Sequence, residues 1–355
     1  MKSRKALVIL AVAIILAVIV FANRGKIQFN WTSFGQQLHH ISWLHIAIGV
    51  ALIYSTYWLR SARWAVFISA TKKVPPFSLV GPQFIGFTAV ALIGRLADIT
   101  RPALVAKKVG LPVSSQLAVY TIERMFDLGA AALIFSSALI FIPHDMAHRD
   151  IFVRTGLFSL AGTAGIAIFA VVLRVAGEAV ARIVHGLLHP LSAPIAESVA
   201  TKIRGFRDGL NAISSAHDFL LTALISLAMW GLIGMAYVET LHAFVESPQL
   251  ATLRFSQVML LMGASIAASI FQIPIIGWFT QIGATAIAMV GFYGASKEAA
   301  TACGALLLFV TFLSIIPAGL IAARLNHVSL RGAATQAEDA EAAEDSNPKR
   351  DMGKA

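Results

Sequence analysis

Eight charged residues within the first 127 positions lie inside or beside long apolar stretches, where groups that bind or catalyse are expected. They are Arg60, Arg63, Arg95, Asp98, Arg101, Glu123, Arg124 and Asp127. Five arginines against three acids leave a formal surplus of two positive charges. A planar guanidinium binds phosphate oxygens through two parallel hydrogen bonds, so the surplus predicts a site for an anion. In so apolar a chain, a lipid phosphate is the expected anion.

The same residues have a second interpretation, an internal ion-pair network that only holds helices together. A charge at the centre of a membrane helix costs about 2.5–3.5 kcal/mol, so eight facing lipid would cost roughly 20–28 kcal/mol. Most of them must therefore face one another, a wet cavity or the headgroup zone. Pairing arginine with an acid is also an economical way to bury charge, so both interpretations stay open.

The composition indicates what kind of chain must position these residues. Of 355 residues, 57% are hydrophobic and only 13% charged, and the mean hydropathy is +0.76. An ordinary soluble domain is roughly 45–50% apolar and about 25% charged. This excludes a soluble enzyme, a disordered chain and, with Cys303 as the single cysteine, a disulfide-rich domain. The net charge of +10 is expected to face anionic lipid and not nucleic acid.

The apolar runs predict an all-α polytopic membrane protein with six long spans and two broken, re-entrant-like helical hairpins. The spans are Ala6–Ala22, Ile46–Ala70, Ser114–Ile142, Ile151–Leu173, Leu220–Val245 and Ala299–Ala323, and the hairpins are Phe77–Val105 and Phe255–Ala295. The first span is interpreted as a retained anchor, with a signal peptide cleaved before Asn23 as the alternative. One transmembrane domain would cover residues 1–331, and residues 332–355 would form a disordered cytoplasmic tail.

Lysine and arginine positions predict the orientation. With both termini in the cytoplasm of a cell (inner) membrane protein, most basic loop residues fall on the cytoplasmic side. These are Lys72, Lys73, Lys107, Lys108, Arg174, Arg182, Lys202, Arg204, Arg207, Arg324 and Arg331. Two amphipathic segments, 28–41 and 194–215, are expected to lie at the membrane interface, and the second has partner docking as its alternative.

The hairpins are expected to break at Gly94 and Pro102 in the first half and at Pro274 and Gly277 in the second. If the residues after Gly94 are helical, Arg95, Asp98 and Arg101 form a ladder at three-residue spacing. Each half would then consist of a span, a broken hairpin and a second span, and the two halves would cross the membrane in opposite directions. That pattern is typical of inverted-repeat transporters; the alternative is the same helices without symmetry.

Motifs for other chemistry are missing from the sequence. It contains no glycine-rich nucleotide loop, no His-Glu-x-x-His helix and no Gly-x-Ser-x-Gly elbow. His39, His40, His144 and His148 fall in expected outer loops and are interpreted as surface residues. No catalytic residue, metal or cofactor is therefore predicted.

Three stretches resemble the lysylphosphatidylglycerol synthase transmembrane-region family, also called flippase-like integral membrane proteins. They are Arg60-x-x-Arg63-Trp64, the hairpin Gly94-Arg95-Leu96-Ala97-Asp98-Ile99-Thr100-Arg101-Pro102, and Ile122-Glu123-Arg124-Met125-Phe126-Asp127. The resemblance extends to about Arg324. In the second hairpin, the family's Pro-x-x-Gly-Gly-x-Gly-x-x-Glu pattern survives only as Pro274, Gly277 and Gly283, without the acid near Gln281.

The resemblance implies a protein that binds, and translocates, an anionic or polar-headed lipid through a cavity lined by Arg, Asp and Glu. The eight charged residues would bind this substrate. The alternatives are a membrane-embedded group transferase, with Glu123 or Asp127 as base, and an accessory or scaffold subunit for a lipid-modifying enzyme. A standalone aminoacyltransferase is not expected, since no soluble domain follows the last span. The expected partners are a membrane lipid and either a second copy or a lipid-modifying enzyme, with no nucleic acid.

Overall fold

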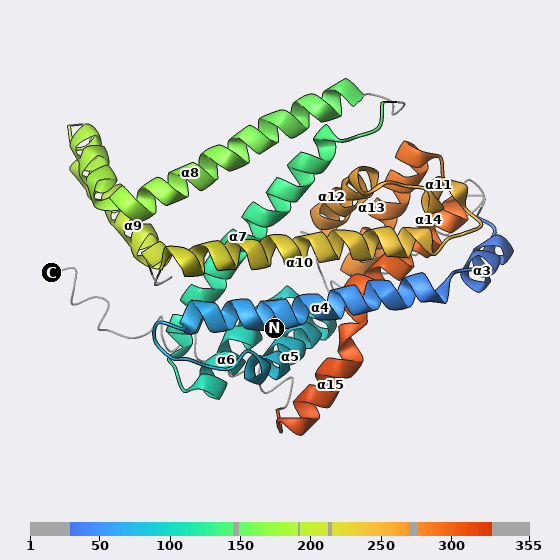
Figure 1. Cartoon of the computed structure of the whole chain (residues 1–355), viewed down its shortest axis with the longest axis horizontal. Coiled ribbons are helices and arrows are strands. Elements are labelled where there is room, and N and C mark those ends of the chain that lie inside the picture. Colours follow the sequence, from blue (N-terminus) through green and yellow to red (C-terminus); the bar gives the residue numbers. More distant parts are fainter. Residues whose placement is uncertain (1–28, 145–148, 191, 212–214, 270–275, 329–355) are drawn as a thin grey trace, which may run out of the picture.

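The computed structural model describes residues 29–144, 149–190, 192–211, 215–269 and 276–328, and within these ranges it contains helices and no strands (Figure 1). The all-α prediction is confirmed. Three of the described helical runs are long and apolar enough to cross a membrane: 149–169, 216–242 and 297–325. A fourth crossing results if α3 (Trp31–His39) and α4 (Trp43–Ile68), which are bent by 75°, count as one span.

This count falls short of the six long spans predicted. Ala6–Ala22 lies outside the described residues. Helix α7 (Val113–Ile140) is long enough, but every 18-residue stretch of it contains Glu123, Arg124 and Asp127. The charges of α7 are thus the reason why it does not pass as an ordinary apolar span, whereas α5 (Phe77–Ile93) is apolar but has only 17 residues.

Helices α4 and α10 (Ala216–His242) run side by side through the molecule, and α7 crosses them (Figure 1). Gly49 of α4 lies in a tight position, because a Cβ there would lie 3.2 Å from Cγ1 of Val310 and 3.4 Å from the carbonyl oxygen of Ala236 in α10. The side chain of Ser215 caps α10 by accepting a hydrogen bond from the amide of Asp218 at 3.0 Å. This pair of helices forms the frame on which the other elements pack.

The first hairpin consists of α5 (Phe77–Ile93), the 3₁₀ helix η1 (Arg95–Ile99) and α6 (Thr100–Val109). Gly94 separates α5 from η1 with φ +95° and ψ −173°, a conformation essentially restricted to glycine, so the predicted break at Gly94 is confirmed. The prediction for Pro102 was wrong. It lies in the first turn of α6, where the helix does not need the amide that proline lacks.

The second half contains α10, the short α11 (Pro248–Ala251), α12 (Phe255–Ser269) and α13 (Ile276–Tyr293). The last run is α14 (Lys297–Leu308), the π-helical segment η2 (Phe309–Leu313) and α15 (Ile315–Leu325). Pro274 lies outside the described residues, and Gly277 is the second residue of α13, directly after residues 270–275, which are not described, so both breaks of the second hairpin stay predictions. Both halves have the element order expected of a repeat, and the symmetry itself stays a prediction.

Helices α8 (Arg149–Leu188) and α9 (Ala193–Asn211) form an arm that extends away from the other helices (Figure 1). Helix α8 is longer than the predicted span 151–173, and Ala176 interrupts it with φ −119° and ψ 19°. The arm joins α7 where Ser136 and Ser159 share a hydrogen bond of 2.6 Å. The helices expected within 28–41 and 194–215 are both present, as α3 and α9.

Candidate functional site: a buried charged cluster

Five of the predicted residues meet between α4, α6 and α7, and we call them the charged cluster: Arg60, Arg63, Arg101, Glu123 and Asp127. All five are buried; Arg60 is the most accessible at 8% exposure and Arg63 the least at 0%. Charges this deep need partners at hydrogen-bonding distance, because desolvation costs several kcal/mol per ion.

Glu123 lies at the centre of the cluster and bridges two helices. Its carboxylate accepts from Arg63 Nη2 on α4 at 2.8 Å and pairs with Arg101 Nη1 on α6 at 2.7 Å. Arg60 Nη1 lies 3.6 Å away. One carboxylate from α7 therefore holds guanidinium groups from both α4 and α6.

Asp127, one turn after Glu123, completes the pairing with α4. Its Oδ1 accepts from Arg63 Nη1 at 2.8 Å and its Oδ2 from Arg60 Nη1 at 3.2 Å. The three- and four-residue spacings place both arginines on one face of α4 and both acids on one face of α7. Arg63 Nη1 also donates to Ser226 Oγ on α10 at 2.6 Å, which ties the cluster to the frame of the fold.

Arg101 is surrounded by aromatic rings as well as by polar partners. Its guanidinium carbon lies 5.2, 4.8 and 5.1 Å from the ring centres of Trp64, Phe87 and Tyr120. Gln83 Oε1 accepts from its Nη1 at 3.2 Å. Cation–π contacts favour a desolvated guanidinium, so these rings stabilise its positive charge away from water.

Glycine makes the position of Arg101 possible. A Cβ on Gly86 of α5 would lie 2.7 Å from the Cβ of Arg101. Only a residue without a side chain allows α6 to approach α5 so closely. The hairpin therefore folds back far enough to bring its arginine to the acids of α7.

The cluster is not fully compensated. Three arginines face two carboxylates, which leaves a formal surplus of one positive charge. Three buried guanidinium nitrogens, Arg63 Nε, Arg101 Nε and Arg101 Nη2, have no hydrogen-bond acceptor. Buried donors are normally paired, so donors of this kind, on a surplus cation, are sites that an anion would satisfy.

A second, partly exposed group lies at the edge of the cluster. Arg124 Nη2 is 3.5 Å from Asp98 Oδ1, and the Tyr120 hydroxyl donates to Asp98 Oδ2 at 2.8 Å. The Arg124 and Asp98 side chains are 38% and 26% exposed. Arg124 Nη1 also lies 3.9 Å from Asp127, so this edge pair connects the buried acids to the outside of the cluster.

The expected ladder of Arg95, Asp98 and Arg101 is therefore wrong. Asp98 lies in η1 and pairs with Arg124, whereas Arg101 lies in α6 and turns to Glu123. The chain passes from a 3₁₀ to an α-helix between them, so a common face is not maintained. Arg95 opens η1, and its side chain lies outside what the structure describes.

Sequence reasoning missed several neighbours of the cluster, namely Gln83, Phe87, Gln116 and Ser226. Gln83 and Ser226 are polar residues inside apolar runs, and that signal was available. Gln116 accepts from the Trp64 indole nitrogen at 2.9 Å and so fixes one of the rings around Arg101. Within the described residues, no three His, Cys, Asp or Glu side chains gather in an arrangement that suits a metal ion.

A comparison with protein families places this geometry in context. A family model described as "Lysylphosphatidylglycerol synthase TM region" matches residues 8–319, which includes every residue of the cluster. No curated protein and no solved structure matches the chain. The match covers most of the chain and agrees with the apolar helices of the fold. The chain therefore belongs to the lysylphosphatidylglycerol synthase TM region family and is a multi-pass, α-helical integral membrane protein.

Proposed function

We propose that this protein binds an anionic or polar-headed lipid at the charged cluster and moves it across the membrane. Membership of a family named for a lipid synthase supports a role in lipid metabolism or handling. The observation that carries the proposal is the surplus guanidinium charge, with three buried N–H groups that have no acceptor. A phosphate brings the missing negative charge and several acceptor oxygens.

The energetics favour such a ligand. A hydrogen bond to a charged group contributes about 1.5–3 kcal/mol, and an unpaired buried donor costs about 1–3 kcal/mol. Occupying Arg63 Nε, Arg101 Nε and Arg101 Nη2 with phosphate oxygens would remove three such costs at once. The same phosphate would cancel the single surplus charge. Arg63 and Arg101 are thus proposed to contact phosphate. Arg60 and Arg95, to which the sequence gave the same role, are kept in the proposal without a described open donor.

The acids have a different role in this proposal. Glu123 and Asp127 orient the guanidinium groups of α4 and α6, while Asp98 is placed to hold a cationic part of a headgroup. Arg124 is proposed to act either with the arginines that contact phosphate or with the acids. Because the edge pair of Asp98 and Arg124 is the exposed part of the site, the headgroup is proposed to enter there and to separate that pair. Rocking of the two halves would then change which leaflet the cluster faces.

The membrane topology follows from the same charges. We propose that α4 and α7 also cross the membrane, with their charges turned toward each other, in addition to the apolar spans. Lys72, four residues after the end of α4, donates to the carbonyl oxygen of Val109 at 2.6 Å, so the chain after α4 lies beside the end of α6, near Lys107 and Lys108. A basic end of this kind supports a cytoplasmic location in a cell inner membrane.

Group transfer is less well supported by the geometry. A general base needs a carboxylate that can face a substrate, whereas Glu123 and Asp127 are buried and each has two guanidinium groups at hydrogen-bonding distance and a third within 4 Å. The accessory role, a second copy and a partner enzyme stay predictions, since no contact in the described residues bears on them.

A lipid-exposure assay tests the proposal. Wild-type protein is reconstituted in vesicles that carry fluorescent phosphatidylglycerol, and a membrane-impermeant quencher reports lipid arriving at the outer leaflet. Arg101→Ala is expected to slow this arrival about tenfold or more, because it removes two of the three open donors and about 1.4 kcal/mol corresponds to a factor of ten. Lys73→Ala, which removes an exposed cation, is the control. Unchanged transport in folded Arg101→Ala would rule out the assigned role.

A further inference from the structure

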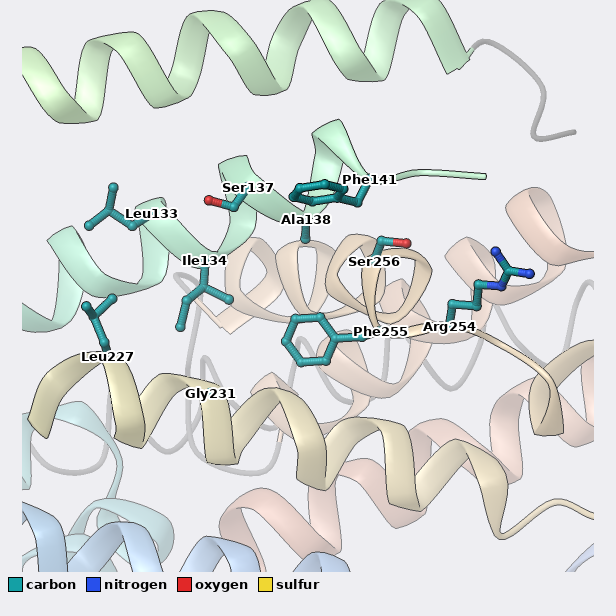
Figure 2. A pocket seen from close by; sticks show the side chains of 10 residues that line it. All are labelled: Leu133, Ile134, Ser137, Ala138, Phe141, Leu227, Gly231, Arg254, Phe255 and Ser256. Atoms are coloured by element: carbon teal, nitrogen blue, oxygen red, sulfur yellow. The ribbon is translucent and has the colours of Figure 1, made fainter. Parts of the chain in front are cut away.

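A second feature lies away from the charged cluster, in a crevice between α7, α10 and the start of α12. It has a volume of about 600 Å³, within the range of about 300–1,000 Å³ that is usual for small-molecule sites. Figure 2 shows Leu133 and Ile134 of α7 and Leu227 of α10 toward one end, and Arg254 at the other. The lining is almost entirely apolar, apart from Arg254 and two serines.

Two glycine contacts close the walls of the crevice and a third glycine leaves it open. A Cβ on Gly263 of α12 would lie 2.7 Å from the Phe135 ring of α7, and a Cβ on Gly234 of α10 would lie 2.8 Å from the Phe255 ring. These contacts hold the three helices together. Gly231, one turn before Gly234, has no atom within 4 Å of the position of its Cβ. The open space beside Gly231 is therefore part of the crevice.

The dimensions and the charge of the crevice indicate what kind of molecule fits it. From Leu133 to Phe141, α7 advances about 12 Å at 1.5 Å per residue, and one leaflet of the hydrocarbon core measures about 15 Å. Arg254 lies between α11 and α12, after the end of the apolar span 216–242, so we place it at the surface end of that span. It is exposed and forms no ion pair within the described part of the chain.

We propose that this crevice binds one acyl chain of an anionic phospholipid whose phosphate pairs with Arg254. The crevice is nearly as long as one leaflet, which suits an acyl chain. The unpaired cation at its surface end suits the phosphate of the same lipid. This site goes beyond the proposed transport function and does not depend on it. Leu227 adjoins Ser226, which binds Arg63, so the inner end of the crevice lies next to the charged cluster.

Photolabelling of the full-length protein tests the chain-binding part. The protein is reconstituted in phosphatidylcholine vesicles that contain a trace of phosphatidylglycerol with a diazirine in one acyl chain, and labelled peptides are mapped by mass spectrometry. We expect label concentrated on 133–141 and 227–231. Gly231→Leu should reduce it about tenfold or more, since its side chain displaces methylene groups from the crevice. Gly165→Leu, on the exposed face of α8, should leave it unchanged.

A second pair of lipids tests the headgroup part. Phosphatidylcholine with the same photoreactive chain should label these peptides about fivefold less, the effect expected for a single cation at a membrane surface. Arg254→Gln should abolish this preference, whereas Lys73→Gln should retain it. Label spread evenly over lipid-facing helices, label unchanged in folded Gly231→Leu, or equal labelling by both lipids in the wild type would each overturn the proposal. None of these outcomes bears on transport at the charged cluster.

Discussion

Replacing Glu123 by glutamine separates a lipid-binding cluster from a purely structural one. The substitution keeps the shape of the side chain and removes one of two carboxylates, so the surplus of positive charge rises from one to two. Arg63 and Arg101 each lose a charged partner in a buried setting, where breaking a pair costs about 3–5 kcal/mol. We expect a loss of that size in the free energy of unfolding.

Addition of lipid gives the decisive comparison. If the cluster binds a lipid phosphate, phosphatidylglycerol supplies the charge that Glu123→Gln removes and restores part of the stability. A ligand at about one hundred times its Kd stabilises by about 2.7 kcal/mol. Phosphatidylcholine carries no net charge and is expected to restore less.

The assay is unfolding of the purified protein in mixed micelles, with either lipid added at equal mole fraction. Glu178→Gln serves as the control, because Glu178 pairs with Arg204 and Arg207 on the exposed arm. Surface pairs contribute about 0–1 kcal/mol, so this variant should lose little stability and gain nothing specific from either lipid. Equal stabilisation of Glu123→Gln by both lipids would refute the reasoning and favour a structural ion network.

Three further substitutions test how the cluster is positioned. Gly86→Ala should destabilise the protein by about 1–3 kcal/mol, because its methyl group meets Arg101. Thermal unfolding measures this loss. Gly129→Ala is the control, since its methyl group meets no neighbour and should not lower the stability. Gly94→Ala should cost about 1–3 kcal/mol because of its backbone conformation, and unchanged stability would argue against that conformation. Ser226→Ala removes an acceptor from a buried guanidinium and should cost about 1–3 kcal/mol, less than Glu123→Gln in the same unfolding experiment.

The sequence predicted the cluster because charge inside an apolar run is expensive wherever it is not paired. That argument expected most of the eight charges to face one another, a wet cavity or the headgroup zone, and in the structure Arg60 and Arg63 pair with Glu123 and Asp127. It also predicted the break at Gly94, since only glycine adopts that backbone conformation easily. Family membership, inferred from the same residues, is confirmed by the match over residues 8–319.

The choice of partners was not predictable in the same way. Asp98 pairs with Arg124 and not with Arg101, because the change from 3₁₀ to α-helix turns their side chains to different neighbours. Proline usually breaks a helix, but Pro102 lies in the first turn of α6, where proline is tolerated. Ser226 is a polar residue in an apolar run, but its sequence position did not indicate Arg63 as its partner, since serine in a helix often bonds only its own backbone.

The structure supports three apolar spans, or four with the bent pair of α3 and α4, and not the six predicted. Ala6–Ala22 lies outside the described residues, and α7 was counted as a span although it carries three charges. Hydropathy treats each residue separately, whereas the charges of α7 are neutralised by groups on α4 and α6 that only the fold brings near. Pairing between helices is therefore the information that the sequence pattern lacks.

The most direct test of the central claim is a distance between lipid phosphorus and arginine nitrogen. Protein labelled with ¹⁵N in its arginine guanidinium groups is reconstituted with phosphatidylglycerol, and ³¹P–¹⁵N dipolar coupling is recorded by solid-state NMR. We expect coupling at hydrogen-bonding range that weakens in Arg101→Lys and persists in Arg254→Gln. Lipid transport by a protein whose coupling is unaffected by Arg101→Lys would contradict the assignment of the charged cluster as the phosphate site.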